Sequence, residues 1–154
     1  MKFSLKEDVA LPAESVFAAV SDFAQYERLA RQRGAEMTRR DPGREPVPGS
    51  AWDLRFPWRG RERRMSLLLT ALTPPRRLEL TGRSANLDTA FAVEVLPLAR
   101  DRARIVFDID IRPRTITARL VVQSARLARG RITVRLAARL RAFARDTEAR
   151  AGRG

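Results

Sequence analysis

The chain has 154 residues, of which 44% are hydrophobic, which suffices for the core of one domain and excludes disorder throughout. It contains no cysteine and no histidine, which excludes disulfides, thiolate chemistry, histidine-based catalytic triads and histidine-ligated metal sites. The net charge of +13 is concentrated at the end of the chain, where residues 112–154 hold twelve arginines and only two acids. Such a charge suggests nucleic acid, anionic lipid or an acidic protein as a partner, or else a helix face that arginines merely solvate.

Targeting and membrane signals are weak. The first fifteen residues are charged and contain no apolar run of signal-peptide length. The longest apolar stretch, Met65 to Leu72, is far shorter than the ~20 residues that span a bilayer. The sequence therefore predicts a soluble, cytoplasmic protein.

The N-terminal quarter predicts a strand, two short helices and a second strand. Apolar and charged residues alternate from Lys2 to Ala10, as in a strand with one buried face. Pro12 is placed to begin a short helix, and Ser21-Asp22 is placed to cap a second one, which Gly34 would end. A strand from Ala35 to Arg40 follows.

Five further strands are expected before the last helix, because apolar residues alternate with polar ones and prolines or glycines stand between the runs. The connections are too short for parallel crossovers, so the sheet should be antiparallel. The expected strands cover Ser50–Trp58, Arg63–Leu72, the segment around Leu78 and Leu80, Leu87–Leu96 and Arg104–Arg112.

One long helix is predicted from Thr115 to Glu148, since it is the only element long enough to cover the apolar face of the sheet. Gly130 lies in its middle, and the apolar residues before and after it fall about half a turn apart. This pattern indicates either a bend that lets the first half act as a gate or a redirected apolar stripe without motion. The fold class is α+β, with one domain over residues 1–150 and a basic tail at 151–154.

Four segments resemble the START-like superfamily, also called SRPBCC or birch-allergen-like, which includes polyketide cyclases, dehydratases and lipid transport proteins. These segments are Val9–Phe23, Gly49–Trp52, Pro74–Leu78 and the closing helix. The resemblance covers essentially the whole chain. It implies the helix-grip fold, in which a curved seven-stranded antiparallel sheet wraps around a long C-terminal helix and leaves a cavity between them, but it implies no particular reaction.

The predicted cavity would bind a hydrophobic or amphipathic small molecule such as a lipid, a quinone or a polyketide, without a metal or cofactor. The same pattern is also compatible with a filled core. The candidate ligand-binding residues are Trp52, Leu54, Phe56, Met65, Leu80, Phe91, Val93, Ile109, Leu120, Gln123 and Leu127.

Two other functions stay open. A cyclase- or dehydratase-like enzyme would need an acid and a base beside the ligand, but Asp108 and Asp110 fall on the face opposite the isoleucines, and no residue is assigned as catalytic. A nucleic-acid or ribosome-associated role would rest on charge alone, because Phe143 is the only aromatic residue of the helix. An anionic membrane surface is therefore the preferred partner of the basic helix face, through Arg119, Arg126, Arg129, Arg135 and Arg139.

Overall fold

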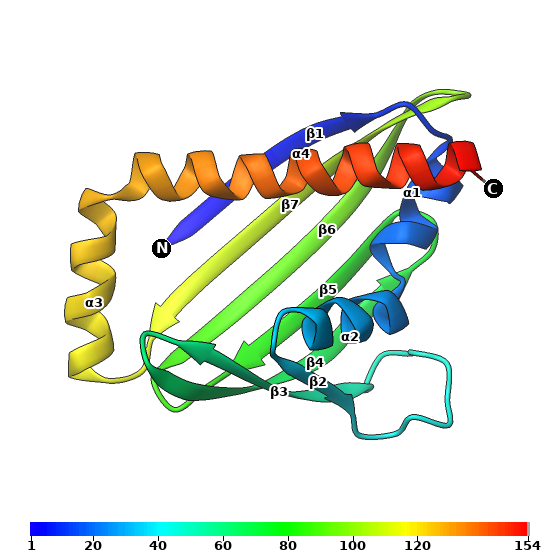
Figure 1. The fold of residues 1–154 in the computed structure, drawn as a ribbon. Coiled ribbons are helices and arrows are strands. Elements are labelled where there is room, and N and C mark those ends of the chain that lie inside the picture. Colours follow the sequence, from blue (N-terminus) through cyan, green and yellow to red (C-terminus); the bar gives the residue numbers. More distant parts are fainter. Residues whose placement is uncertain (154) are drawn as a thin grey trace.

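A seven-stranded antiparallel sheet forms the body of the computed structural model, which describes residues 1–153 (Figure 1). The spatial order is β1-β7-β6-β5-β4-β3-β2, so that β1 and β2 are the two edges. This arrangement confirms the predicted fold class. The strands are β1 (Lys2–Val9), β2 (Glu36–Arg39), β3 (Ala51–Trp58), β4 (Arg61–Thr73), β5 (Arg77–Arg83), β6 (Leu87–Ala99) and β7 (Arg102–Pro113).

Two short helices, α1 (Ala13–Val20) and α2 (Phe23–Gln32), connect β1 to β2. The capping signal in the sequence works as predicted, because the Asp22 side chain accepts a hydrogen bond from the backbone N–H of Gln25 at 3.1 Å. Gly34 follows the end of α2 with a φ of 77°, a left-handed conformation that glycine adopts without steric cost.

The predicted single C-terminal helix is in fact two helices, α3 (Ile116–Leu127) and α4 (Arg129–Arg153), which meet at a steep angle (Figure 1). The break lies at Ala128, whose φ of −101° and ψ of 15° depart from helical values. Gly130 lies inside α4, just after the break. Residues 151–153, predicted to be a tail, continue α4, and Gly154 lies outside the described residues.

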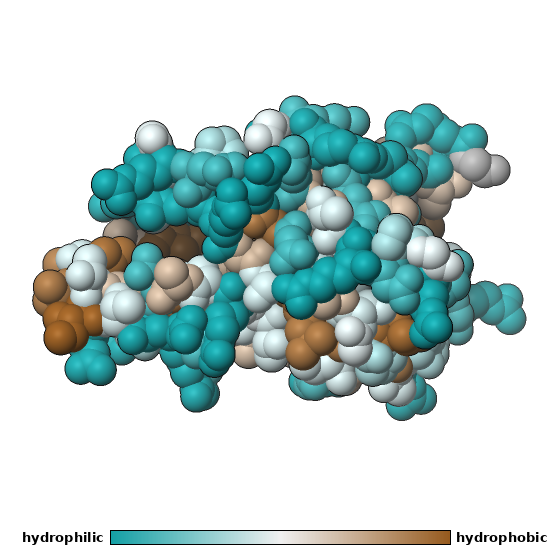
Figure 2. Space-filling model, turned by 90° about the horizontal axis from the view of Figure 1, so that it is seen from below, coloured by the Kyte–Doolittle hydropathy of each residue, from teal (hydrophilic) through white to brown (hydrophobic). Residues whose placement is uncertain are grey.

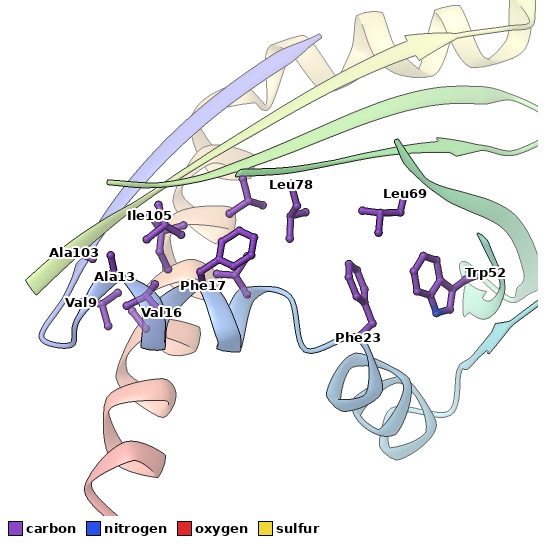
Figure 3. Close-up of a cluster of buried hydrophobic side chains, with 14 residues drawn as sticks. Val9, Ala13, Val16, Phe17, Phe23, Trp52, Leu69, Leu78, Ala103 and Ile105 are labelled. Carbon is purple, nitrogen blue, oxygen red and sulfur yellow. The ribbon is translucent and has the colours of Figure 1, made fainter. Parts of the chain in front are cut away.

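The tightly packed core occupies one end of the sheet, where α1 and α2 cover its concave face (Figure 3). The rings of Phe23 and Trp52 lie 4.8 Å apart between their centroids, which fixes α2 against β3. The buried residues of this cluster are Val9, Ala13, Val16, Phe17, Val20, Phe23, Trp52, Leu69, Leu78, Val93, Val95, Ala103, Ile105 and Ala144.

Helix α4 is fastened to the edge strand β1. Ala144 of α4 is fully buried, and Glu148 accepts a hydrogen bond from the backbone N–H of Ala10 at 2.7 Å. Two arginines of the same helix donate to main-chain carbonyls of the strand, Arg129 to that of Lys2 and Arg145 to that of Asp8. The helix therefore covers one border of the concave face and leaves the middle strands less enclosed.

Candidate ligand-binding cleft

Burial on the concave face changes along the strands. Residues beneath α1 and α2 are fully buried (Figure 3), and Trp52, Val95 and Ile105 have exposed fractions of 0%, 1% and 1%. Toward the β3–β4 hairpin the inward side chains become half-buried, and Trp58 at the end of β3 is 49% exposed. The apolar side chains at this end of the concave face are therefore only partly covered, and we call this part of the face the candidate cleft.

The cleft residues are the half-buried apolar side chains on the concave face of β3 to β7, and the half-buried apolar residues of α4 are their counterparts on the helix. From the strands they are Leu54, Phe56, Met65, Leu67, Leu80, Phe91, Phe107 and Ile111, and from the helix they are Ile132, Leu136 and Leu140. Figure 2 shows hydrophobic atoms at the bottom of a hollow on this side of the molecule. Near the hairpin, Phe56, Trp58, Met65 and Leu87 line a pocket of about 530 Å³, a volume typical of small-molecule sites.

Polar side chains join these apolar ones, among them the hydroxyl of Thr89 and the guanidinium of Arg63. Thr89 is 8% exposed and donates to the carbonyl of Gly82 at 3.3 Å. Arg63 lies over the Trp58 ring at 5.4 Å from its centroid. An apolar surface with a few polar groups is suited to orienting an amphipathic molecule.

The carboxylates with shifted pKa values lie outside the cleft, each beside an arginine. Hydrogen bonds from Arg40, Arg83 and Arg104 lower the pKa of Asp53, Asp88 and Asp8, respectively. These pairs are exposed on the surface of the protein. They offer no acid or base to a molecule in the cleft.

Tyr26 is the only tyrosine, and it is committed to packing. Its hydroxyl donates to the carbonyl of Val20 at 2.6 Å, and burial raises its pKa. Within residues 1–153, no group of three or more carboxylates is placed to hold a metal ion. None of the helices in that range is long and apolar enough to cross a membrane.

The predicted ligand-binding residues fall into three groups, which lie in the cleft, in the packed core and on the exposed side of α3. Leu54, Phe56, Met65, Leu80 and Phe91 lie together in the cleft, with the buried Ile109 beside them on β7. Trp52 and Val93 belong to the packed core instead.

The third group was expected to line the cavity but lies on the exposed side of α3. It consists of Leu120, Gln123 and Leu127. Leu120 and Leu127 are 60% and 93% exposed. The side of α3 that is buried carries Ala118 and Val122, about half a turn away from the leucines. These three residues therefore do not line an enclosed cavity.

The five predicted surface arginines do not share one helix face, because the break at Ala128 separates them. Arg119 and Arg126 lie on α3, whereas Arg129, Arg135 and Arg139 lie on α4. Arg129 also lies over the Phe3 ring, at 4.6 Å from its centroid, and is thus engaged with β1. Their binding to an anionic surface stays a prediction.

Several cleft residues were absent from the prediction, namely Leu67, Leu87, Phe107, Ile111 and Arg63. Phe107 and Ile111 share the alternation that places Ile109 inward, so the pattern of β7 already contained them. Leu67 could not be assigned, because it begins a run of three leucines whose facing is ambiguous. The register settles it, pairing Leu67 with Trp52 on the concave side.

Sequence and structure comparisons agree with this architecture. The family model for polyketide cyclase / dehydrase and lipid transport matches residues 1–148. The chain belongs to this family. No curated protein matches it.

Solved structures of similar fold include a synthase, an aromatase/cyclase and Ara h 8.0201. This cyclase/dehydrase and lipid transport family member is similar to a point mutant of norcoclaurine synthase from Thalictrum flavum in complex with a transition-state analogue, with a TM-score of 0.71 and 13% identity over 98% of this chain and 96% of that one. It is similar to the ZhuI aromatase/cyclase from Streptomyces sp. R1128, with a TM-score of 0.68 and 16% identity over 98% and 95%. It also resembles Ara h 8.0201, with a TM-score of 0.63 and 10% identity over 100% and 99%. At these identities the likeness shows the fold.

Proposed function

We propose that the protein binds a hydrophobic or amphipathic small molecule, such as a lipid, a quinone or a polyketide-like compound, in the cleft between the sheet and α4. The observation that carries the proposal is the fall in burial along β3 to β7 from the packed core to the hairpin end. Apolar side chains left half-exposed in a concave surface favour an apolar guest, because the guest removes that surface from water. Membership of a family that includes lipid transport supports the same proposal.

Two measurements test it. Native mass spectrometry of the purified protein should reveal a co-purifying small molecule, and a fluorescent fatty acid should bind saturably. Met65→Glu should weaken that binding by about tenfold or more, because it places a carboxylate among apolar side chains. Leu98→Glu is the matched control, since Leu98 lies outside the cleft at the far end of β6 and is 37% exposed.

A second cleft variant guards against misfolding. Leu136→Trp adds volume from the α4 side and should reduce binding while the circular dichroism spectrum stays that of the wild type. Absence of both a co-purifying molecule and saturable binding by the wild type would reject the proposal.

A cyclase- or dehydratase-like activity is the alternative, and the family match favours keeping it. The polar groups at this cleft include Arg63 and Thr89, together with Glu62, Ser84 and Asn86 at the pocket near the hairpin. The test is ring closure of a poly-β-ketone mimic followed by absorbance, in which the wild type would exceed both Arg63→Gln and Thr89→Val. Equal rates with and without protein would remove the alternative.

The third possibility, binding of nucleic acid through charge, has less support. Its expected basic surface is split between α3 and α4. Transient contact of a lipid carrier with an anionic membrane fits the cleft better, because a membrane is where such a ligand is loaded.

A further inference from the structure

Large apolar side chains gather on the exposed side of α3. Ile116, Leu120 and Leu127 are 79%, 60% and 93% exposed, and Figure 2 shows a hydrophobic patch at the α3 end of the molecule. Spacings of four and seven residues put the three on one side of the helix. Helix α3 thus has two apolar sides, and the one with the larger residues has no partner within residues 1–153.

The tip of the β3–β4 hairpin lies at the same end of the molecule. Arg114, just before α3, donates from its main-chain N–H to the carbonyl of Asn86 at 2.7 Å and from its side chain to that of Ser84 at 2.6 Å. The pocket near the hairpin brings Ser84 and Asn86 together with Trp58. The start of α3, the β5–β6 turn and the hairpin therefore surround the mouth of the cleft.

This end of the molecule is also strongly basic. The hairpin carries Arg59, Arg61, Arg63 and Arg64 against the single acid Glu62, and α3 carries Arg119 and Arg126 with no acid. The guanidinium of Arg59 lies 4.6 Å from the centroid of the half-exposed Trp58 ring. Indole rings prefer the headgroup level of a bilayer, leucines its acyl boundary and arginines its phosphates.

We infer that the exposed side of α3 and the tip of the β3–β4 hairpin form one docking surface for an anionic lipid bilayer. Trp58, Ile116, Leu120 and Leu127 enter the interface while Arg59, Arg61, Arg119 and Arg126 meet lipid phosphates. A second copy of the chain suits this surface poorly, because the arginine margin would face arginines. The docking does not depend on which ligand the cleft binds. Only the orientation of the cleft mouth toward the bilayer rests on the proposed function.

Tryptophan fluorescence provides a direct test, because the chain has two tryptophans and Trp52 is 0% exposed. Vesicles of phosphatidylcholine with about a third phosphatidylglycerol should shift the emission of Trp58 to shorter wavelength, and brominated lipids should quench it. Trp58→Phe should abolish both changes, and because Trp58 also lines the pocket, the changes support docking only when the protein co-sediments with the vesicles. Unchanged emission of the wild type together with no co-sedimentation would overturn the inference.

Paired variants test the two components of the surface by vesicle co-sedimentation. Leu120→Ser/Leu127→Ser should weaken binding about tenfold, since two inserted side chains are lost. The control Leu98→Ser/Val134→Ser changes two other exposed apolar residues and should stay within about twofold. Equal losses in the two double variants would contradict the docking surface.

Charge is tested in the same way. Arg119→Gln/Arg126→Gln should remove most of the preference for anionic over neutral vesicles. Arg100→Gln/Arg102→Gln, at the β6–β7 turn on the opposite side of the molecule, should retain it (Figure 1). A wild-type preference that does not depend on phosphatidylglycerol or salt would contradict the inference.

Other occupants would give different results. A dimer in sedimentation velocity that Leu120→Ser/Leu127→Ser dissociates would assign the surface to a second copy instead. Binding of an RNA oligonucleotide that these substitutions leave intact, without vesicle binding, would assign the charge to nucleic acid. Fatty-acid binding measured without vesicles separates the two proposals. If the protein binds the fatty acid but not the vesicles, only the docking inference is rejected. If it binds the vesicles but not the fatty acid, only the proposed ligand binding in the cleft is rejected.

Discussion

At the scale of single residues, Gly82 decides how closely β5 and β6 pack beside the cleft. A Cβ atom at this buried position would lie 2.4 Å from the Thr89 hydroxyl oxygen and 3.1 Å from a methyl carbon of Leu67. Both distances are too short for ordinary contact, so a Cβ atom here would force these side chains to move.

We expect Gly82→Ala to lower the free energy of unfolding by about 1–3 kcal/mol, because Thr89 and Leu67 must move to admit the methyl group. Urea denaturation measures the change. Gly43→Ala is the control, since no atom lies within 4 Å of its added Cβ, and it should shift stability by less than about 0.5 kcal/mol. Equal stability of the two variants would show that the strands relax freely.

The ion pair of Asp8 and Arg104 gives a pH-dependent prediction. Arg104 donates to Asp8 at 2.7 Å and lowers the carboxyl pKa below its usual 3.8. A pKa lowered by folding contributes stability above pH 3.8 that is lost as the pH falls through the folded-state pKa.

Asp8→Asn should therefore be less stable than the wild type at pH 7, and the difference should shrink below about pH 4. Urea midpoints across this range measure it. Arg104→Gln should lose the same pH-dependent part of the stability, and the double variant Asp8→Asn/Arg104→Gln should lose no more than either single variant. A difference that stays constant down to pH 2 would refute the assignment.

At the scale of elements, the strands were largely predictable and the last helix was not. Alternation over Ser50–Trp58 identified β3 within one residue, because the sheet has one apolar face. The break at Ala128 lies two residues before Gly130, where the sequence indicates a bend as one of two interpretations, but the local pattern does not predict that the helix divides into α3 and α4.

The buried side of α3 was misassigned for a related reason. The side of α3 with Leu120 and Leu127 is the more hydrophobic one. The smaller residues Ala118 and Val122 nevertheless face the protein, because small side chains let the helix approach β7 closely. Likewise, alternation along β3 could not separate the core residue Trp52 from the cleft residue Leu54. Trp52 is buried in the core because Phe23 of α2 packs against its ring.

The attachment of α4 depends on a small residue. Ala144 is 0% exposed against the core, so Ala144→Leu should cost about 1–3 kcal/mol of unfolding free energy by overpacking. Ala142→Leu, on the exposed side of the same helix, should be nearly neutral. Thermal and urea denaturation measure both. A tolerated Ala144→Leu would mean that α4 is held mainly by its arginines.

At the scale of the whole molecule, stability should be unevenly distributed. The α1 end contains the packed core, whereas α3 buries only Ala118 and Val122. Hydrogen-exchange mass spectrometry should find the amides of α3 exchanging about a hundredfold faster than those around Ala144 in α4. Similar protection of both helices would show that α3 opens only when the whole protein unfolds.

The arginines that bond β1 have a consequence for how the protein behaves in concentrated solution. An unpaired strand border is a template onto which another chain can add and begin a fibril. Here Arg129 and Arg145 already occupy two carbonyls along that border, and the opposite border, β2, is only four residues long. Part of the arginine content thus keeps molecules from joining strand to strand.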